Sequence, residues 1–221
     1  MVYFKGKWVF KFDPSSTYSA SFHNCDGSDA SIDMMHQRFD AGDIRYYEDD
    51  RFKAVRLPYR HAESEQLFMD LILPLDDSLE VLDKWRSEPT EYREGFLRNL
   101  RSAGSEYGVN LSLPRFTMKS DFDLTEAFRK MGMGDVLSNG ASFDRIILGQ
   151  TLKVGNGKHQ SKIEVDESGT IAAAVTEIVM DGCTCCPEPP RKDFRCDRPF
   201  IFVIAGGKSG AGLFVGYVGD F

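Results

Sequence analysis

The sequence has few cysteines, no long apolar run and no excess of positive charge. No segment approaches the roughly 20 apolar residues that a membrane-spanning helix needs, and the start, MVYFKGKWVFKF, lacks the apolar core of a secretion signal. With a net charge of −7, the 221-residue chain is not expected to bind nucleic acid or a membrane. Five cysteines, an odd number, argue against a complete disulfide framework. They favour a cytoplasmic over an extracellular location, and both stay open.

The residue patterns of an enzyme or a metal centre are also absent from the sequence. The four histidines, at positions 23, 36, 61 and 159, are dispersed, and there is no Gly-x-Ser-x-Gly nucleophile motif. Cys183, Cys185 and Cys186 have a spacing that suits a soft metal, but a structural zinc site needs four ligands. The triplet Gly207-Lys208-Ser209 joins two apolar segments, whereas a phosphate-binding loop leads into a helix. We therefore predict no enzymatic activity, no metal and no cofactor. An enzyme, or a thiol–metal site at 183–186, is the weakest alternative.

What the sequence does have is a series of short, Phe-rich segments of alternating polarity, which are typical of β-strands. Strands are predicted at 2–12, 31–37, 44–47, 52–57, 67–74, 109–114, 152–165, 200–204 and 213–218. The pattern predicts helices at 79–85 with Ser78 as N-cap, at 90–103, and from Asp123 or Thr125 to about 131–132. A turn is expected at 14–16, and a hairpin turn between the last two strands.

The most informative segment runs from Val165 to Thr176, where a short acidic cluster leads through Gly169 into a block of small side chains. An Ala-rich run taken alone favours a helix, because Ala has the highest helix propensity. The alternative is a strand-forming arm that leads into the Gly-, Cys- and Pro-containing segment 181–191, which is predicted to be an exposed loop. The basic residues at 191, 192, 195 and 198 are expected to form a solvated edge of that loop.

Nine segments of the chain, taken in order, resemble the serpins, the serine protease inhibitor superfamily. They are YFKGKWVFKFDPSST (3–17), MMHQ (34–37), LPYR (57–60), LILP (71–74), NLSLPRF (110–116), DLTEAFRKMGMGDVLSNGASF (123–143), EVDESGTIAAAVTEIVM (164–180), DRPFIFVI (197–204) and LFVGYV (213–218). The resemblance covers essentially the whole chain but only the C-terminal part of a serpin, a little over half. It implies one partial serpin domain over 1–221, of the α+β class with mostly antiparallel sheets and a few helices. The N-terminal helices and some central strands have no counterpart.

The resemblance implies a suicide inhibitor of a serine protease, with a cysteine protease also possible. The target would cut an exposed reactive loop at 170–193, and the loop's N-terminal arm would then insert as a strand into the central sheet. A non-inhibitory binding or structural protein of serpin descent, or an inactive fragment, is the alternative. A proline or a charge in the hinge would favour that alternative, and residues 170–176 contain neither. The hinge residues implied are Glu167, Gly169, Thr170, Ala172, Ala173, Ala174 and Thr176.

The hinge residues suit insertion, because Thr170, Ala172, Ala174 and Thr176 have one parity and would share one face of the inserted strand. All four are small, so that face can be buried with little steric resistance. Ile171 would lie on the other face, where inhibitory serpins usually have glutamate.

The position of the scissile bond follows from the family's usual spacing. Counted from Gly169, the spacing puts Cys183 just before the cut and Thr184 just after it, with Met180, Gly182 and Cys185 as alternatives. No Lys or Arg lies between Lys162 and Arg191, so the target is not expected to be trypsin-like. A chymotrypsin-, elastase- or cathepsin-like protease fits better.

Two further roles follow from the resemblance alone. His159 stands at the position of the histidine that holds the middle strands of the serpin sheet together. Arg115 and Glu167 match a pair that forms a salt bridge where the loop begins.

Overall fold

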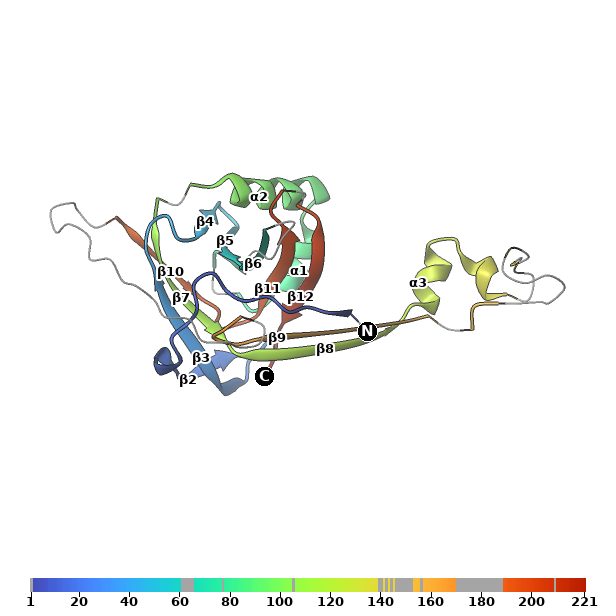
Figure 1. The fold of residues 1–221 in the computed structure, drawn as a ribbon, viewed down its shortest axis with the longest axis horizontal. Coiled ribbons are helices and arrows are strands. Elements are labelled where there is room, and N and C mark those ends of the chain that lie inside the picture. The colour runs from blue at the N-terminus through green and yellow to red at the C-terminus, as the bar shows by residue number, and fades with distance from the viewer. Residues whose placement is uncertain are drawn as a thin grey trace. The chain divides into compact units, whose positions relative to one another are not determined.

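The computed structural model describes residues 2–60, 66–76, 78–104, 106–138, 141, 143, 145, 153–155, 157–169, 189–208 and 210–221. The chain divides into two compact units (Figure 1). The first comprises Met1–Lys5 and Thr117–Glu164, and the second comprises Gly6–Phe116 and Val165–Phe221.

The second unit contains a five-stranded sheet in the order β12-β11-β6-β5-β4. Its strands are β4 (Arg45–Glu48), β5 (Phe52–Pro58), β6 (Leu67–Pro74), β11 (Phe200–Gly206) and β12 (Gly212–Val218), and every neighbouring pair is antiparallel. The predicted hairpin around the glycines at 206–210 is confirmed, because β11 and β12 pair from Phe200↔Val218 onward. β6 and β11 lie in the middle of the sheet and are buried along almost their whole length, as the apolar runs predicted.

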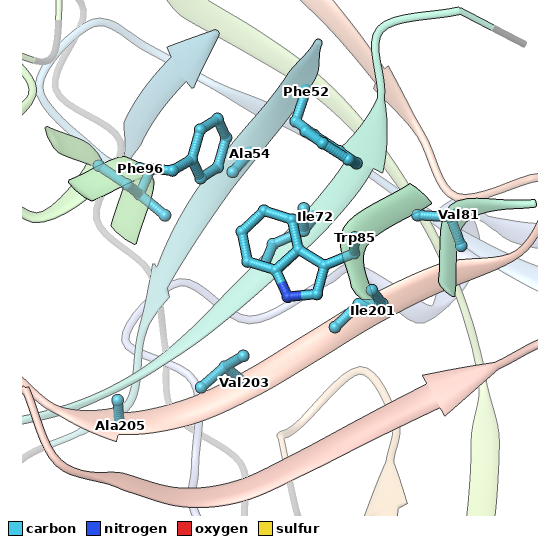
Figure 2. Close-up of a cluster of buried hydrophobic side chains, with 10 residues drawn as sticks. Phe52, Ala54, Ile72, Val81, Trp85, Phe96, Ile201, Val203 and Ala205 are labelled. Carbon is cyan, nitrogen blue, oxygen red and sulfur yellow. The ribbon is translucent and has the colours of Figure 1, made fainter. Parts of the chain in front are cut away.

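Two helices, α1 (Val81–Ser87) and α2 (Thr90–Ser102), contact this sheet and enclose an aromatic core with it (Figures 1 and 2). The ring of Trp85 meets Phe52 edge-on at a centroid distance of 5.1 Å and Phe96 at 5.6 Å. Each fully buried ring of this kind contributes about 1.5–3 kcal/mol through removal of its surface from water. Sequence periodicity predicted both helices, but α1 begins two residues later than expected. Glu80, not Ser78, is its N-cap.

A charged pair lies inside the five-stranded sheet. Arg56 of β5 and Asp70 of β6 are cross-strand partners whose side chains are each 1% exposed. The guanidinium donates two hydrogen bonds, from Nε to Oδ1 and from Nη2 to Oδ2, both at 2.6 Å. This bidentate geometry compensates both charges, which neither residue could tolerate alone at this depth.

The second unit also contains a four-stranded sheet in the order β10-β7-β3-β2. Its strands are β2 (Thr17–His23), β3 (Asp29–Phe39), β7 (Gly108–Pro114) and β10 (Arg191–Arg195). β10 runs parallel to β7, from Arg191↔Gly108 to Arg195↔Ser112. The prediction of a solvated loop edge at 191–198 is therefore wrong. Residues 191–195 are a strand, and Arg198 is only 8% exposed.

The first unit contains a three-stranded sheet in the order β1-β9-β8. Its strands are β1 (Val2–Tyr3), β8 (Phe116–Asp123) and β9 (Lys158–Val165), and they are accompanied by α3 (Thr125–Lys130) and a short 3-10 helix (Gly134–Leu137). β1 pairs parallel with β9 through Val2↔Ser161 and Tyr3↔Lys162. Asp123 accepts a hydrogen bond from the Thr125 backbone N–H at 2.8 Å, which marks the predicted start of α3.

Two predicted strands are shorter than the sequence pattern indicated. The strand expected at 2–12 ends at Tyr3, because the next segment bonds to several partners in turn instead of one ladder. The strand expected at 152–165 begins at Lys158 within the described residues. A Cβ at Gly157 would lie 2.7 Å from the Phe128 ring, so this glycine packs against α3 before the strand starts. The α+β class with mostly antiparallel sheets and few helices is confirmed.

Candidate functional site

The described chain covers the place where the predicted reactive loop leaves the body of the protein and the place where it returns. The arm residues from Thr170 to Thr176 and the scissile-bond candidates Met180, Gly182, Cys183, Thr184 and Cys185 lie outside the described residues. Ile171 also lies outside them. The candidate site in the described chain is therefore the loop base, defined as residues 166–169 with the side chains and backbone that hold them. The return point is β10, whose first residue is Arg191.

The loop base is a closed four-residue turn. Asp166 donates its backbone N–H to the Gly169 carbonyl at 3.0 Å, and Gly169 donates its own to the Asp166 carbonyl at 3.1 Å. The Asp166 carboxylate also accepts from the Ser168 N–H at 2.8 Å. An Asp side chain that bonds to the backbone two residues ahead is a common way to nucleate a turn. The chain is thus fixed at the first two residues of the predicted hinge, Glu167 and Gly169, immediately before the arm that begins at Thr170.

Gly169 is required by this turn for two reasons. Its φ is +107°, a conformation that side chains of L-residues rarely adopt. In addition, a Cβ at this position would lie 2.4 Å from the Gly6 carbonyl oxygen, 2.6 Å from the Trp8 nitrogen and 2.7 Å from the Lys7 Cα. All three are backbone atoms and cannot move aside. The sequence predicted a glycine for backbone freedom, and the structure adds that the neighbouring backbone leaves no room for a side chain.

The segment from Lys7 to Phe12 clamps the loop base. Trp8 donates its backbone N–H to the Ser168 carbonyl at 3.1 Å and its indole Nε1–H to the Asp166 carbonyl at 2.9 Å, while Phe12 donates to the Glu167 carbonyl at 3.0 Å. The Trp8 ring is 1% exposed and stacks on Tyr59 at 4.4 Å between centroids. Nothing in the local sequence around Trp8 indicated this contact, because the two segments are more than 150 residues apart.

Glu167 anchors the loop base electrostatically. Its carboxylate accepts hydrogen bonds from Arg115 Nε at 2.8 and 2.9 Å and from the Thr17 hydroxyl at 2.5 Å, and Arg115 Nη2 lies 2.5 Å away. Arg115 also lies 3.4 Å from Asp33. Glu167 is 6% exposed as a residue, and the Arg115 side chain is 43% exposed. The two residues therefore form an ion pair. The role that the resemblance implies for this pair, at the start of a reactive loop, stays a prediction.

Burial of the Glu167 carboxyl by itself raises its pKa, but the hydrogen bonds from Arg115 and Thr17 outweigh burial. The pKa of Glu167 consequently lies below its ordinary value. A lowered pKa in the folded state means that the unfolded chain binds the proton more readily. The contribution of Glu167 to stability is therefore complete above about pH 4.3 and is lost as the pH falls through the folded-state pKa.

Replacing Glu167 with glutamine should lower the free energy of unfolding by about 1–2 kcal/mol at pH 7, an amount limited by the exposure of Arg115. The difference between wild type and Glu167→Gln should shrink as the pH falls below about 4.3, and it should vanish only below the folded-state pKa, where the wild-type carboxylate is protonated in the folded protein as well. Urea unfolding at several pH values measures this. The control is Glu126→Gln, whose partner Arg129 is 59% exposed, and it should change little at any pH. A Glu167→Gln difference that is independent of pH would contradict the assignment.

His159, predicted as the histidine that holds the middle strands together, is the second residue of β9 and is exposed. That role stays a prediction. Among the described residues no three His, Cys, Asp or Glu side chains gather as a metal site, and no described helix is long and apolar enough to cross a membrane. Cys25 is an exposed free thiol and Cys196 a buried one, while the cysteines at 183, 185 and 186 lie outside the described residues.

Comparisons with known proteins agree with the geometry. The family model Serpin (serine protease inhibitor) matches residues 1–220. The chain is 35% identical to Serpin-Z10 of Arabidopsis thaliana, covering 99% of this chain and 55% of that protein. It is 31% identical to human Serpin B3, with 97% and 53% covered. The solved structure of native protease nexin-1 with heparin is 27% identical, with a TM-score of 0.76, and 99% and 54% of the chains are covered.

A second solved structure, the thermophilic serpin tengpin in its native state, matches with a TM-score of 0.76 at 23% identity and supports the fold. The chain spans about half the length of the relatives it matches. The family model covers nearly every residue. The chain belongs to the serpin family.

Proposed function

We propose that this chain carries the reactive loop and hinge of a serine protease inhibitor that acts as a suicide substrate. The protease cuts the loop between Cys183 and Thr184, and the arm from Thr170 to Thr176 then inserts as a strand between β1 and β9. The observation that carries the proposal is the loop base. It is a glycine-dependent turn held by a few backbone hydrogen bonds and one ion pair, so the arm starts from a fixed point.

The parallel pairing of β1 with β9 supports insertion of the arm between them, antiparallel to both strands. An arm that folds back after the 166–169 turn runs antiparallel to β9, from which it continues. Because β1 is parallel to β9, the same arm would be antiparallel to β1 as well. Insertion would then separate the pairs Val2↔Ser161 and Tyr3↔Lys162 and replace one short parallel contact with two antiparallel ones. Antiparallel pairing is slightly more stable per residue than parallel pairing, so the exchange favours the inserted state.

The target proposed is a serine protease that accepts a medium-sized apolar residue, with a cysteine protease as a further possibility. The lack of Lys and Arg between Lys162 and Arg191 supports a target that is not trypsin-like. If the protease does not cut between Cys183 and Thr184, the alternative scissile peptide bonds involve Met180, Gly182 or Cys185. The proposal involves no enzymatic activity of the chain itself, no cofactor and no nucleic acid or membrane partner.

The test is incubation of the 221-residue chain with chymotrypsin, pancreatic elastase, a cathepsin and trypsin, followed by a denaturing gel. Trapping predicts a band that withstands denaturation and has the mass of the protease joined to residues 1–183. N-terminal sequencing of the released piece, expected to begin at Thr184, locates the cut. Trypsin is the control and should give no such band from this loop. Cleavage of the loop by chymotrypsin, elastase or the cathepsin without any covalent band would refute trapping.

A second candidate function is that of a non-inhibitory serpin whose loop is a passive ligand or substrate. One observation favours it. β1 contributes only Val2 and Tyr3 as the second neighbour of an inserted arm, so most of the arm would pair with β9 alone in these 221 residues. This candidate predicts loop cleavage with no covalent band and no rise in the thermal midpoint of the cleaved protein, whereas insertion predicts a rise.

A further inference from the structure

One buried polar atom in the four-stranded sheet has no hydrogen-bond partner in the part of the chain that the structure describes. The Nε2 atom of His36, in the middle of β3, is buried and makes no hydrogen bond among the described residues. The other ring nitrogen, Nδ1, lies 3.0 Å from the Ser112 hydroxyl of β7, and the ring stacks on Tyr18 of β2 at 4.1 Å between centroids and 11° between planes. A buried polar group without a partner is costly and calls for an explanation.

His36 belongs to a row of side chains that crosses the whole sheet. Ser112 is the cross-strand partner of His36 on β3 and of Arg195 on β10, and Tyr18 lies diagonally opposite His36 on β2. The four strands lie side by side in the order β10-β7-β3-β2 (Figure 1). β10 is the strand on which the predicted reactive loop returns to the body, and the Ser112 carbonyl also accepts from the Cys196 N–H at 2.8 Å. The row therefore links His36 to the contacts by which β10 and the residue after it pair with β7.

The geometry of the row accepts only the neutral imidazole. A neutral ring needs one N–H, and Ser112 can satisfy Nδ1 as donor or acceptor. A protonated ring carries two N–H groups, and the buried Nε2–H would have no acceptor. Burial, followed by the positive charge of Arg195, holds the pKa of His36 below its ordinary value. A cavity of about 560 Å³ lies beside the row and offers the ring a route out to water.

The titratable and polar groups around His36 come from all four strands of the sheet. β2 contributes Tyr18, β3 itself contributes Arg38, and β7 contributes only the uncharged Asn110 and Ser112. β10 contributes Asp193 and Arg195, which pair with each other at 3.2 Å, and the segment after β10 contributes Asp197. Asp193 also accepts from the Asn110 side chain at 2.9 Å. Neither aspartate lies within hydrogen-bond distance of Nε2, so protonation of His36 gains no direct carboxylate partner.

We propose that His36 is an acid-sensitive joint of the four-stranded sheet. Protonation drives its ring out from between Tyr18 and Ser112 and loosens the attachment of β7 and β10. The direction in which stability changes with pH follows from the linkage between proton binding and folding. Because the unfolded or opened chain binds the proton more readily than the closed sheet, stability is complete above about pH 6.5 and falls as the medium is acidified below it. The joint is a property of the sheet alone, so it stands or fails independently of protease trapping.

The experiment is amide hydrogen exchange on the full chain between pH 7.5 and 5.5, corrected for the intrinsic rate at each pH. Uptake of one proton can raise the opening constant by at most about tenfold per pH unit. We expect a rise of about threefold or more in β7 and β10 of wild type. His36→Phe retains a ring that can stack on Tyr18 but cannot be protonated. His36→Gln retains a polar group that likewise cannot be protonated in this pH range. Both should show no acid-dependent rise. His23→Gln is the control, because His23 lies on the same sheet but its side chain is 53% exposed, and it should behave as wild type.

A wild-type opening constant that is independent of pH would overturn the proposal, as would an acid-dependent rise that survives in both His36 variants. If His36→Phe does not fold, His36→Gln and an NMR titration of the wild-type ring still decide. A His36 ring that titrates like a free imidazole overturns the proposal, and one that titrates at lower pH supports it.

Discussion

An arginine in place of Thr170 should convert the proposed inhibitor into an ordinary substrate. Thr170 shares its parity with Ala172, Ala174 and Thr176, so all four would face the same side of an inserted strand. Insertion would bury that side, and a guanidinium buried there without a partner costs several kcal/mol. With insertion blocked, the acyl-enzyme has time to hydrolyse. The covalent band on a denaturing gel should fall by at least about tenfold, which needs only about 1.4 kcal/mol, while loop cleavage continues.

Ile171→Arg is the matched control for Thr170→Arg, because it places the same side chain one residue along and on the opposite face. That face need not be buried by insertion, so Ile171→Arg should retain most of the covalent band. Equal loss in the two variants would mean that added charge, and not the face it occupies, blocks trapping. Full trapping by Thr170→Arg would show that insertion of the arm is not the mechanism of trapping.

Replacing Gly169 with alanine should lower the free energy of unfolding by about 2–5 kcal/mol. Adopting φ of +107° costs a side chain about 1–2 kcal/mol, and the contacts of 2.4–2.7 Å with the backbone of residues 6–8 add about 1–3 kcal/mol of strain. The loop base would have to move away from the clamp, which also weakens the hydrogen bonds that Trp8 and Phe12 donate to it. Denaturant midpoints at constant m-value measure the loss.

The control for Gly169→Ala is Gly42→Ala. Gly42 has almost the same φ, +105°, but a Cβ there would meet no atom within 4 Å. It should therefore show only the conformational cost of about 1–2 kcal/mol. The difference between the two variants isolates the close approach of the backbone of residues 6–8. Equal losses would show that the clamp does not press on Gly169.

Local pattern was enough to predict the interior of the fold. The apolar runs at 67–74 and 200–204 are central strands because a strand buried on both faces has apolar residues at nearly every position. The same rule failed for Arg191–Arg195, where only Phe194 is buried and the other four residues are charged. An edge strand with one buried residue carries almost no periodic signal. β2 was not predicted, although Tyr18, Ala20 and Phe22 alternate with polar residues in Thr17–His23.

The candidate site was less predictable than the fold because its contacts are long-range. Arg115 and Glu167 are 52 residues apart, and nothing in either local sequence pairs them. Their pairing was expected only from the family resemblance. The clamp by Trp8 and Phe12 was hidden by a regular alternation at 2–12 that looked like a strand, since these rings are buried at the period of a sheet without forming a ladder. The Asp-x-x-Gly pattern of 166–169 is a turn signal that the sequence did offer.

Amide exchange at residues 170–176, before and after a single cut in the loop, is the most direct measurement of whether the freed arm becomes a strand. We expect these amides to exchange slowly in the cut protein, because successive N–H groups of the inserted arm are then bonded alternately to β9 and to β1. The slow exchange should disappear in Thr170→Arg. Exchange at the rate of an unstructured peptide after the cut would contradict it and leave the loop a passive substrate.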